Sequence, residues 1–180
     1  MKKTLILFII LITAQSCIPI RIAPNIDDYK VTRGKKFKKS LPKREMFVFE
    51  DPKESDHFYN YVDTKFQLND ENVYDDVPFI LNNTQYFFSF YEVEIPTKVV
   101  NLGVMFADAM LDDAGIGPLF EDSYGNRKGH WYIAIEVYSD LEKDCLQFNA
   151  LSREAVLKYL RTLKQEYLIT HNYNETVFKN

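Results

Sequence analysis

The alternation of apolar and polar residues predicts a β-hairpin near the middle of the chain. Val77–Leu81 and Thr84–Tyr91 are rich in aromatic and β-branched residues, and Asn82-Asn83 lies between them. Two such runs with a pair of asparagines between them are typical of a hairpin. In Tyr86–Ile95 both alternating sets begin with aromatic residues, which indicates a strand covered on both faces. We interpret these aromatic residues as core rather than as the lining of a ligand groove.

Two further strands are expected outside the hairpin. Phe47–Phe49 is a short apolar run, and His130–Tyr138 alternates so that one face carries Trp131, Ile133, Ile135 and Val137. Asn69–Asp76 is polar and acidic, and Ile116–Lys128 contains glycine, proline and asparagine. Both stretches are therefore expected to be loops.

Two amphipathic helices follow from apolar residues that recur every three or four positions. The first is expected over Pro52–Phe66, with Asp51 as its N-cap and an apolar stripe of Phe58, Val62 and Phe66. The second is expected from Ser152, as N-cap, to about Thr170, with an apolar stripe of Val156, Leu160, Leu163 and Tyr167. Local hairpins flanked by helices indicate an α+β fold, in which a mostly antiparallel sheet has two or three helices packed on one side.

The N-terminal residues have the organisation of an export signal. Lys2-Lys3 precedes an unbroken apolar run, Leu5–Ile12, which is shorter than the roughly 20 residues that a membrane-spanning helix needs. Small residues then precede the cysteine in Thr13-Ala14-Gln15-Ser16-Cys17. This segment resembles the relaxed lipoprotein signal of the Bacteroidetes. The resemblance implies cleavage after Ser16 and a diacylglyceryl group on the thiol of Cys17.

The alternative for this segment is an ordinary signal peptide that is cut near Ser16, with Cys17 incidental. We favour the lipidated form because a cysteine that closes a short apolar run is a fairly specific arrangement. Surface-exported lipoproteins of some Bacteroidetes carry acidic residues directly after the cysteine, whereas Ile18-Pro19-Ile20-Arg21 follows here. We therefore expect a protein anchored by lipid in the outer membrane and facing the periplasm.

Charge divides the mature chain into a basic and an acidic part. Ile18–Arg44 contains nine Lys or Arg and two Asp, whereas residues 45–180 contain eleven Lys or Arg and 24 Asp or Glu. We accordingly expect a signal peptide (1–16), a lipidated cysteine with a basic tether (17–44) and a single acidic α+β domain (45–180). The acidic balance of the whole chain argues against general nucleic-acid binding.

The basic tether has three possible roles. Near an anionic bilayer each of its cations contributes about 1 kcal/mol of attraction. Alternatively it is a solvated linker, or Gly34–Leu41 docks back on the acidic domain. Proline and glycine at several positions, and few large apolar residues, favour an extended first half.

Several stretches of the mature chain resemble a family of uncharacterised flavobacterial lipoproteins. The stretches are Ala23-Pro24-Asn25, Tyr29-Lys30-Val31, Gly34-Lys35-Lys36-Phe37 through Phe49-Glu50-Asp51-Pro52, Phe90–Glu94 and Glu166–Asn174. The resemblance covers most of the mature chain. It implies a location in the cell envelope and a shared fold, and no activity, because the family has no known activity.

No complete metal-binding or nucleophilic motif stands out in the sequence. His57, His130 and His171 lie in no zinc-binding spacing, and we expect all three to be structural. Asp140, Glu142 and Asp144 give half of a calcium-loop pattern, but Cys145 occupies the position where an EF-hand needs glycine. We therefore expect no metal and no cofactor, and we expect Cys145 to be buried and unreactive.

These patterns favour a non-enzymatic binding or structural module over an enzyme. The expected partners are the membrane, through diacylglyceryl-modified Cys17, and an unknown envelope protein or glycan, with no nucleic acid. The alternative is an envelope hydrolase that uses the loop carboxylates Asp112 and Asp113 together with His130. Acid–base groups of that kind must reach a substrate at hydrogen-bond distance.

Overall fold

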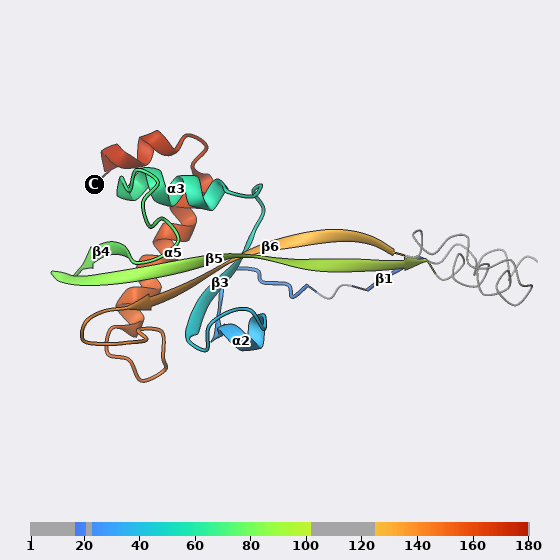
Figure 1. The fold of residues 1–180 in the computed structure, drawn as a ribbon, viewed down its shortest axis with the longest axis horizontal. Helices are drawn as coiled ribbons and strands as arrows, with labels where there is room; N and C mark the ends of the chain where they lie inside the picture. Colours follow the sequence, from blue (N-terminus) through green and yellow to red (C-terminus); the bar gives the residue numbers. More distant parts are fainter. Residues whose placement is uncertain (1–16, 21–22, 102–124, 180) are drawn as a thin grey trace, which may run out of the picture. The chain divides into compact units, whose positions relative to one another are not determined.

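The computed structural model describes residues 17–20, 23–101 and 125–179 (Figure 1). The chain divides into two compact units, of which one contains Asn25–Glu94 and Trp131–Asn180 and is called the body below. The other unit contains Met1–Pro24 and Ile95–His130. The elements in chain order are β1 (Cys17–Ile20), β2 (Lys30–Arg33), α2 (Gly34–Phe37), β3 (Glu45–Asp51), α3 (His57–Phe66), β4 (Val77–Leu81), β5 (Thr84–Asn101), β6 (Gly125–Tyr138), α5 (Arg153–Ile169) and η2 (Tyr173–Lys179).

The strands form one sheet in the order β1-β5-β6-β3-β2, with β4 also paired to β5. The pairs β1–β5, β2–β3, β3–β6 and β4–β5 are antiparallel. The expected α+β class with a mostly antiparallel sheet is thus confirmed. The expected β4–β5 hairpin turns at Asn82 and Asn83, whose φ angles of 52° and 61° lie in the left-handed region that asparagine tolerates.

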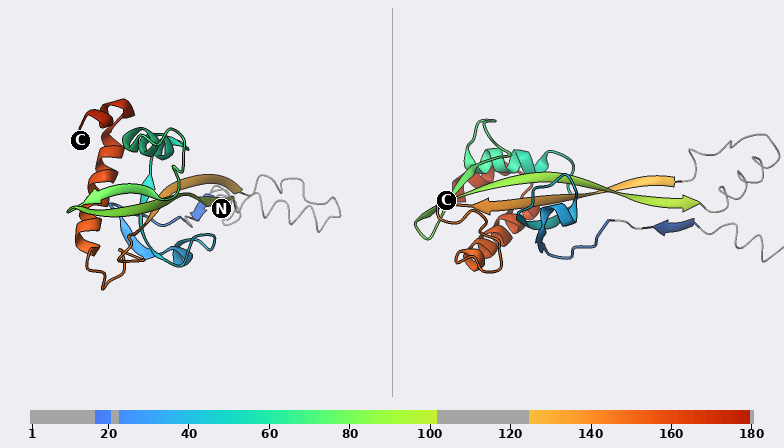
Figure 2. Two further views of the ribbon diagram at one scale, coloured as in Figure 1. Left: turned by 60° about the vertical axis from the view of Figure 1, so that its left-hand side comes forward. Right: turned by 60° about the horizontal axis from the view of Figure 1, so that its bottom comes forward.

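The main hydrophobic core lies between one face of the sheet and the helices α3 and α5 (Figure 2). Phe47 and Phe49 of β3 and Ile133, Ile135 and Val137 of β6 supply the sheet side of this core. The predicted apolar stripe of α5 faces this core, and all four of its side chains are buried: Val156, Leu160, Leu163 and Tyr167. In β6 the intervening residues Tyr132 and Ala134 are buried too, so this strand is covered on both faces.

The opposite face of the sheet is covered by residues that the sequence assigned to the basic tether. The ring of Phe37 in α2 contacts that of Tyr132 with centroids 5.2 Å apart, and Leu41 is buried. A Cβ on Gly34 would lie 2.5 Å from the carbonyl oxygen of Pro42 and 2.7 Å from Sδ of Met46, so glycine permits this close packing. Gly34–Leu41 therefore docks on the body, which was one of the three expectations.

The chain just before β2 is held against α5 by charge. Nζ of Lys164 lies 2.6 Å from a carboxylate oxygen of Asp28, and Arg161 reaches the other oxygen at 2.9 Å. These contacts lower the pKa of Asp28, with the hydrogen bond from Lys164 as the main cause. Residues 25–44 thus fold with the body, because a few apolar and paired side chains outweigh the many solvated lysines.

Several boundaries differ from the prediction, and β5, for example, runs to Asn101 rather than to Ile95. Helix α3 begins at His57 rather than at Pro52, because Asp51 remains in β3 and accepts hydrogen bonds from the N–H of Lys53 at 3.1 Å and from the hydroxyl of Tyr167. β6 begins at Gly125, so the first four residues of β6 replace the end of a predicted loop. Within the described residues, no helix combines the length and the apolar character needed to cross a bilayer.

Candidate functional site

Of the residues proposed from the sequence for catalysis, only His130 lies in the described part of the structure. Asp112 and Asp113 lie outside the described residues. His130 lies in β6 and is half-buried. Cys17 is the first residue of β1 and pairs in register with Asn101 of β5.

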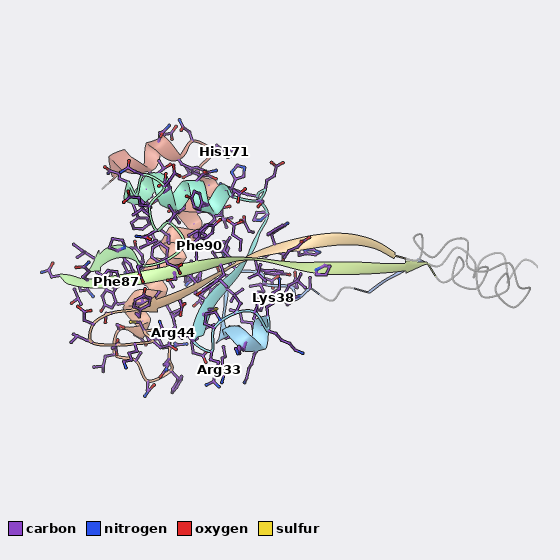
Figure 3. The ribbon with its side chains drawn as sticks, viewed as in Figure 1. Arg33, Lys38, Arg44, Phe87, Phe90 and His171 are labelled. Carbon is purple, nitrogen blue, oxygen red and sulfur yellow. The ribbon has the colours of Figure 1, made fainter. Side chains whose placement is uncertain are left out.

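The other two histidines occupy separate positions in the body. Nδ1 of His57 lies 2.9 Å from the hydroxyl of Tyr173, which links α3 to η2. His171 is exposed and follows the end of α5 (Figure 3). Among the side chains that the structure describes, no group of three His, Cys, Asp or Glu is arranged to hold a metal ion.

The three acidic residues of the calcium-like pattern lie in the segment 139–152, which connects β6 to α5 and which we call the apolar loop. Glu142 accepts hydrogen bonds from the N–H groups of Leu151 at 2.7 Å and Ser152 at 3.2 Å, and from the hydroxyl of Ser152. The hydroxyl of Ser152 is the largest cause of the lowered pKa of Glu142. This carboxylate therefore organises the loop backbone and the start of α5.

Asp144 also holds the backbone of the loop in place through hydrogen bonds. Its carboxylate accepts hydrogen bonds from the N–H of Glu45 at 3.0 Å and from the N–H of Leu146 at 3.2 Å. The first of these bonds joins the loop to the start of β3. Cys145 is fully buried, which confirms its expected burial, and burial raises the pKa of its thiol.

The apolar loop presents large hydrophobic side chains to solvent. Leu141, Phe148 and Leu151 are 87%, 93% and 98% exposed, respectively. Single exposed apolar residues are common on protein surfaces, but this one short connection holds three of the large apolar side chains that are exposed in the described part of the chain. The local sequence pattern does not mark Leu141, Phe148 and Leu151 as exposed, since their only signal is that they fall between predicted elements.

The apolar loop adjoins a basic stretch of the surface. Residues 30–44 contain eight Lys or Arg and no Asp or Glu, and we call them the basic segment. One hollow of about 390 Å³ is lined by residues of both segments, namely Phe148 of the loop and Arg33 and Lys43 of the basic segment, and by Arg153 of α5. Figure 1 shows the loop and α2 below the sheet, and Figure 3 places Arg33 and Arg44 beside α2.

Only part of this positive charge is neutralised within the body. Arg33 pairs with Glu45 at 3.8 Å, Arg44 pairs with Glu136 at 3.4 Å, and Nζ of Lys38 donates to the carbonyl oxygen of Glu94. In the described part of the chain, no ion pair involves the four remaining lysines of the turn around α2: Lys35, Lys36, Lys39 and Lys43.

A second group of polar side chains lies at the C-terminal end of α5. The carboxylate of Asp51 accepts the hydroxyl of Tyr167 at 2.9 and 3.0 Å. Nζ of Lys53 donates to the carbonyl oxygens of Tyr167 at 2.5 Å and Thr170 at 2.7 Å, and it lies 4.3 Å from the ring centroid of Tyr167. A cation at this end of a helix satisfies its free carbonyl groups and its dipole, so the cluster fixes α5 to β3.

Glu92 of β5 is the least satisfied carboxylate near this cluster. One oxygen accepts the N–H of Asp56 at 3.3 Å, whereas Oε1 is buried without a hydrogen-bond partner. Burial raises the pKa of Glu92, and the negative charges of Asp56 and Asp51 add to this effect. The burial of Asp51 likewise raises the pKa of its own carboxyl group.

Replacing Glu92 by glutamine is expected to stabilise the protein at neutral pH by about 1 kcal/mol, because it removes a buried and poorly satisfied charge. Because the pKa of Glu92 is raised in the folded state, the native protein binds more protons at this group than the unfolded chain does. The contribution of Glu92 to the free energy of unfolding therefore falls as the pH rises from the ordinary pKa of a glutamate through the raised pKa of Glu92. The gain from Glu92→Gln should therefore grow over that range. Urea unfolding of parent and variant at several pH values measures it.

The control for this prediction is Glu94→Gln, because Glu94 lies on the same strand and is exposed. The control should change the unfolding free energy by less than about 0.5 kcal/mol at every pH. A loss of stability in Glu92→Gln that does not depend on pH would show that the carboxylate is satisfied in the native state.

Separate comparisons of this chain with protein-family models, with curated proteins and with solved structures found no match in any of the three.

Proposed function

We propose that this protein is held on a bacterial envelope membrane by lipid on Cys17 and that it acts by binding rather than by catalysis. The observation that carries the proposal is the N-terminal order of Lys2-Lys3, an apolar run and Ser16-Cys17. Each acyl chain contributes about 0.8 kcal/mol per buried CH₂, so two or three chains hold a protein on a membrane durably. The residues after the cysteine favour the periplasmic face of the outer membrane.

The body supports a binding role through its surface. The apolar loop exposes Leu141, Phe148 and Leu151, and it lies beside the basic segment. The carboxylates of Glu142 and Asp144 are used to hold the loop backbone in place. A structured loop that presents apolar side chains is suited to contact with another surface, since little conformational entropy is lost on binding.

Mass spectrometry of the protein isolated from its own membranes tests the anchor. The expected N-terminal peptide begins at Cys17 and carries the mass of a diacylglyceryl group, with or without a further acyl group on the amine. The peptide that contains Cys145 serves as an internal control and should carry no lipid, because its thiol is buried. An unmodified mature N-terminus, or an intact leader, would refute the anchor.

A further inference from the structure

The apolar loop is an arrangement that costs free energy in water. Leu141, Phe148 and Leu151 are almost fully exposed, and moving such a side chain out of water is favourable by about 1.5–3 kcal/mol. The loop is nonetheless held in one conformation by Glu142, which accepts hydrogen bonds from residues at its far end, and by Asp144. The exposure is thus a property of an ordered loop, and its occupant must remove these side chains from water.

The way in which these side chains project distinguishes between possible occupants. Leu141 and Leu151 line one hollow, whereas Phe148 lines another together with Arg33 and Lys43, so the three apolar side chains do not form one flat patch. The cores of protein–protein interfaces are closely packed and are depleted in lysine. Separate apolar side chains next to unpaired lysines instead fit a fluid layer of acyl chains under anionic headgroups.

The charge around the loop is complementary to such a layer. Lys35, Lys36, Lys39 and Lys43 form no ion pair in the described part of the chain. Within the loop, the exposed carboxylate of Asp140 is offset by the exposed ammonium of Lys143. The hollow shared by Arg33, Lys43 and Phe148 places cationic groups directly beside an apolar one. Glu45 and Asp144 also line this hollow, but the first pairs with Arg33 and the second accepts backbone N–H groups.

We propose that the apolar loop and the basic segment together form a surface that docks the body on an anionic phospholipid bilayer. The loop side chains enter the acyl boundary, and the lysines lie at the level of the phosphates. This docking deepens the proposed function and rests on it in one respect, since the lipid on Cys17 brings the body to the bilayer. Seven residues lie between Cys17 and Asn25, so these two residues are at most about 28 Å apart along an extended chain. The effective concentration of the body at the membrane surface is therefore high.

The test uses the mature chain from residue 17 with Cys17→Ser, so that no lipid is attached. Vesicles contain equal parts of phosphatidylethanolamine and phosphatidylglycerol, or phosphatidylcholine alone, and binding is measured by sedimentation. We expect binding to the anionic vesicles that is weakened by salt, and at least about tenfold weaker binding to the neutral ones.

Two variants separate the contributions. The first variant is a triple replacement by serine at Leu141, Phe148 and Leu151. It should lower the partition coefficient on anionic vesicles by about tenfold or more. Replacement of Lys35, Lys36, Lys39 and Lys43 by glutamine should lower it similarly and weaken its dependence on salt. The matched control is Ile80→Ser with Ile169→Ser, because these residues are 74% and 73% exposed elsewhere on the body. The control should bind as the parent does.

The outcomes distinguish the docking surface from the anchor. Three outcomes would overturn the docking surface and leave the lipid on Cys17 untouched. They are equal binding to neutral and anionic vesicles, no binding to either, and unchanged binding of the triple serine variant. Unmodified Cys17 in the native protein, with vesicle binding as expected, would overturn the anchor alone. The midpoint of urea unfolding should be the same for all variants, since every substituted side chain lies on the surface.

Discussion

Loss of the thiol at residue 17 is expected to release the protein almost completely from washed membranes. The variant is Cys17→Ser, exported with a leader that is cleaved without lipidation, so that an uncut apolar leader does not hold the chain in place. In the proposed anchor, two or three acyl chains would supply the durable attachment, and the proposed docking by the apolar loop and basic segment would be weak and partly electrostatic. A wash at about 1 M salt, where the Debye length is about 3 Å, should remove that remainder.

The measurement is the fraction of protein in washed membranes, compared between the parent and the variant. The matched control is Cys145→Ser, which makes the same chemical change at the other cysteine of the chain. Cys145 is buried and packs in the core, so its variant should stay with the membranes as the parent does. Retention of Cys17→Ser after the salt wash would show that attachment does not depend on lipid at this residue.

The parts of the fold that the sequence predicted are those specified by local patterns. The stripe of Val156, Leu160, Leu163 and Tyr167 has the period of a helix, and all four side chains are buried in α5. The Asn82-Asn83 pair specifies a hairpin turn through its own backbone preference. In both cases the information lies within a few neighbouring residues, so no knowledge of the rest of the chain is needed.

The parts that the sequence did not predict depend on partners far along the chain. Asp51 has the spacing of a helix N-cap, but the hydroxyl of Tyr167 and the N–H of Lys53 engage its carboxylate, and α3 starts at His57. The basic segment has the composition of a solvated linker, yet β2 pairs along its length with Met46, Phe47 and Val48 and their neighbours in β3. Long-range pairing of this kind leaves little trace in local composition.

In the candidate site, too, some features could be predicted from local sequence and others could not. Cys17 and the excess of lysine and arginine before residue 45 can be read from the sequence, because lipidation signals and net charge are local properties. The exposure of Leu141, Phe148 and Leu151 cannot be read from the sequence. An apolar residue in a connection can be buried or exposed, and only the surrounding fold decides which. The acidic residues that drew attention as metal ligands are instead the groups that hold this loop in shape.

Replacing Phe58 by alanine is expected to lower the free energy of unfolding by about 3–5 kcal/mol, the range for loss of a buried aromatic side chain. Phe58 is fully buried in α3 and lies at the centre of an aromatic cluster. Its ring centroid is 4.8 Å from that of Phe90, 4.9 Å from that of Tyr167 and 5.9 Å from those of Phe49 and Tyr61. These rings come from β3, α3, β5 and α5, so the cavity would loosen the contact of both helices with the sheet. Since domains of this size have a total stability of about 5–15 kcal/mol, the variant should be close to unfolding.

Urea unfolding measures the loss, and Phe148→Ala provides a control with the same change in side chain. Phe148 is 93% exposed in the apolar loop, so its replacement should change the unfolding free energy by less than about 0.5 kcal/mol. If Phe58→Ala fails to fold, Phe58→Leu keeps part of the apolar volume and should lose less stability, with a measurable transition. Equal losses at positions 58 and 148 would contradict both the central place of Phe58 in the core and the exposure of Phe148 on which the docking surface depends. A large loss at position 58 alone would support both, since the same substitution would then separate the side chain that holds the body together from the one that is free to enter a bilayer.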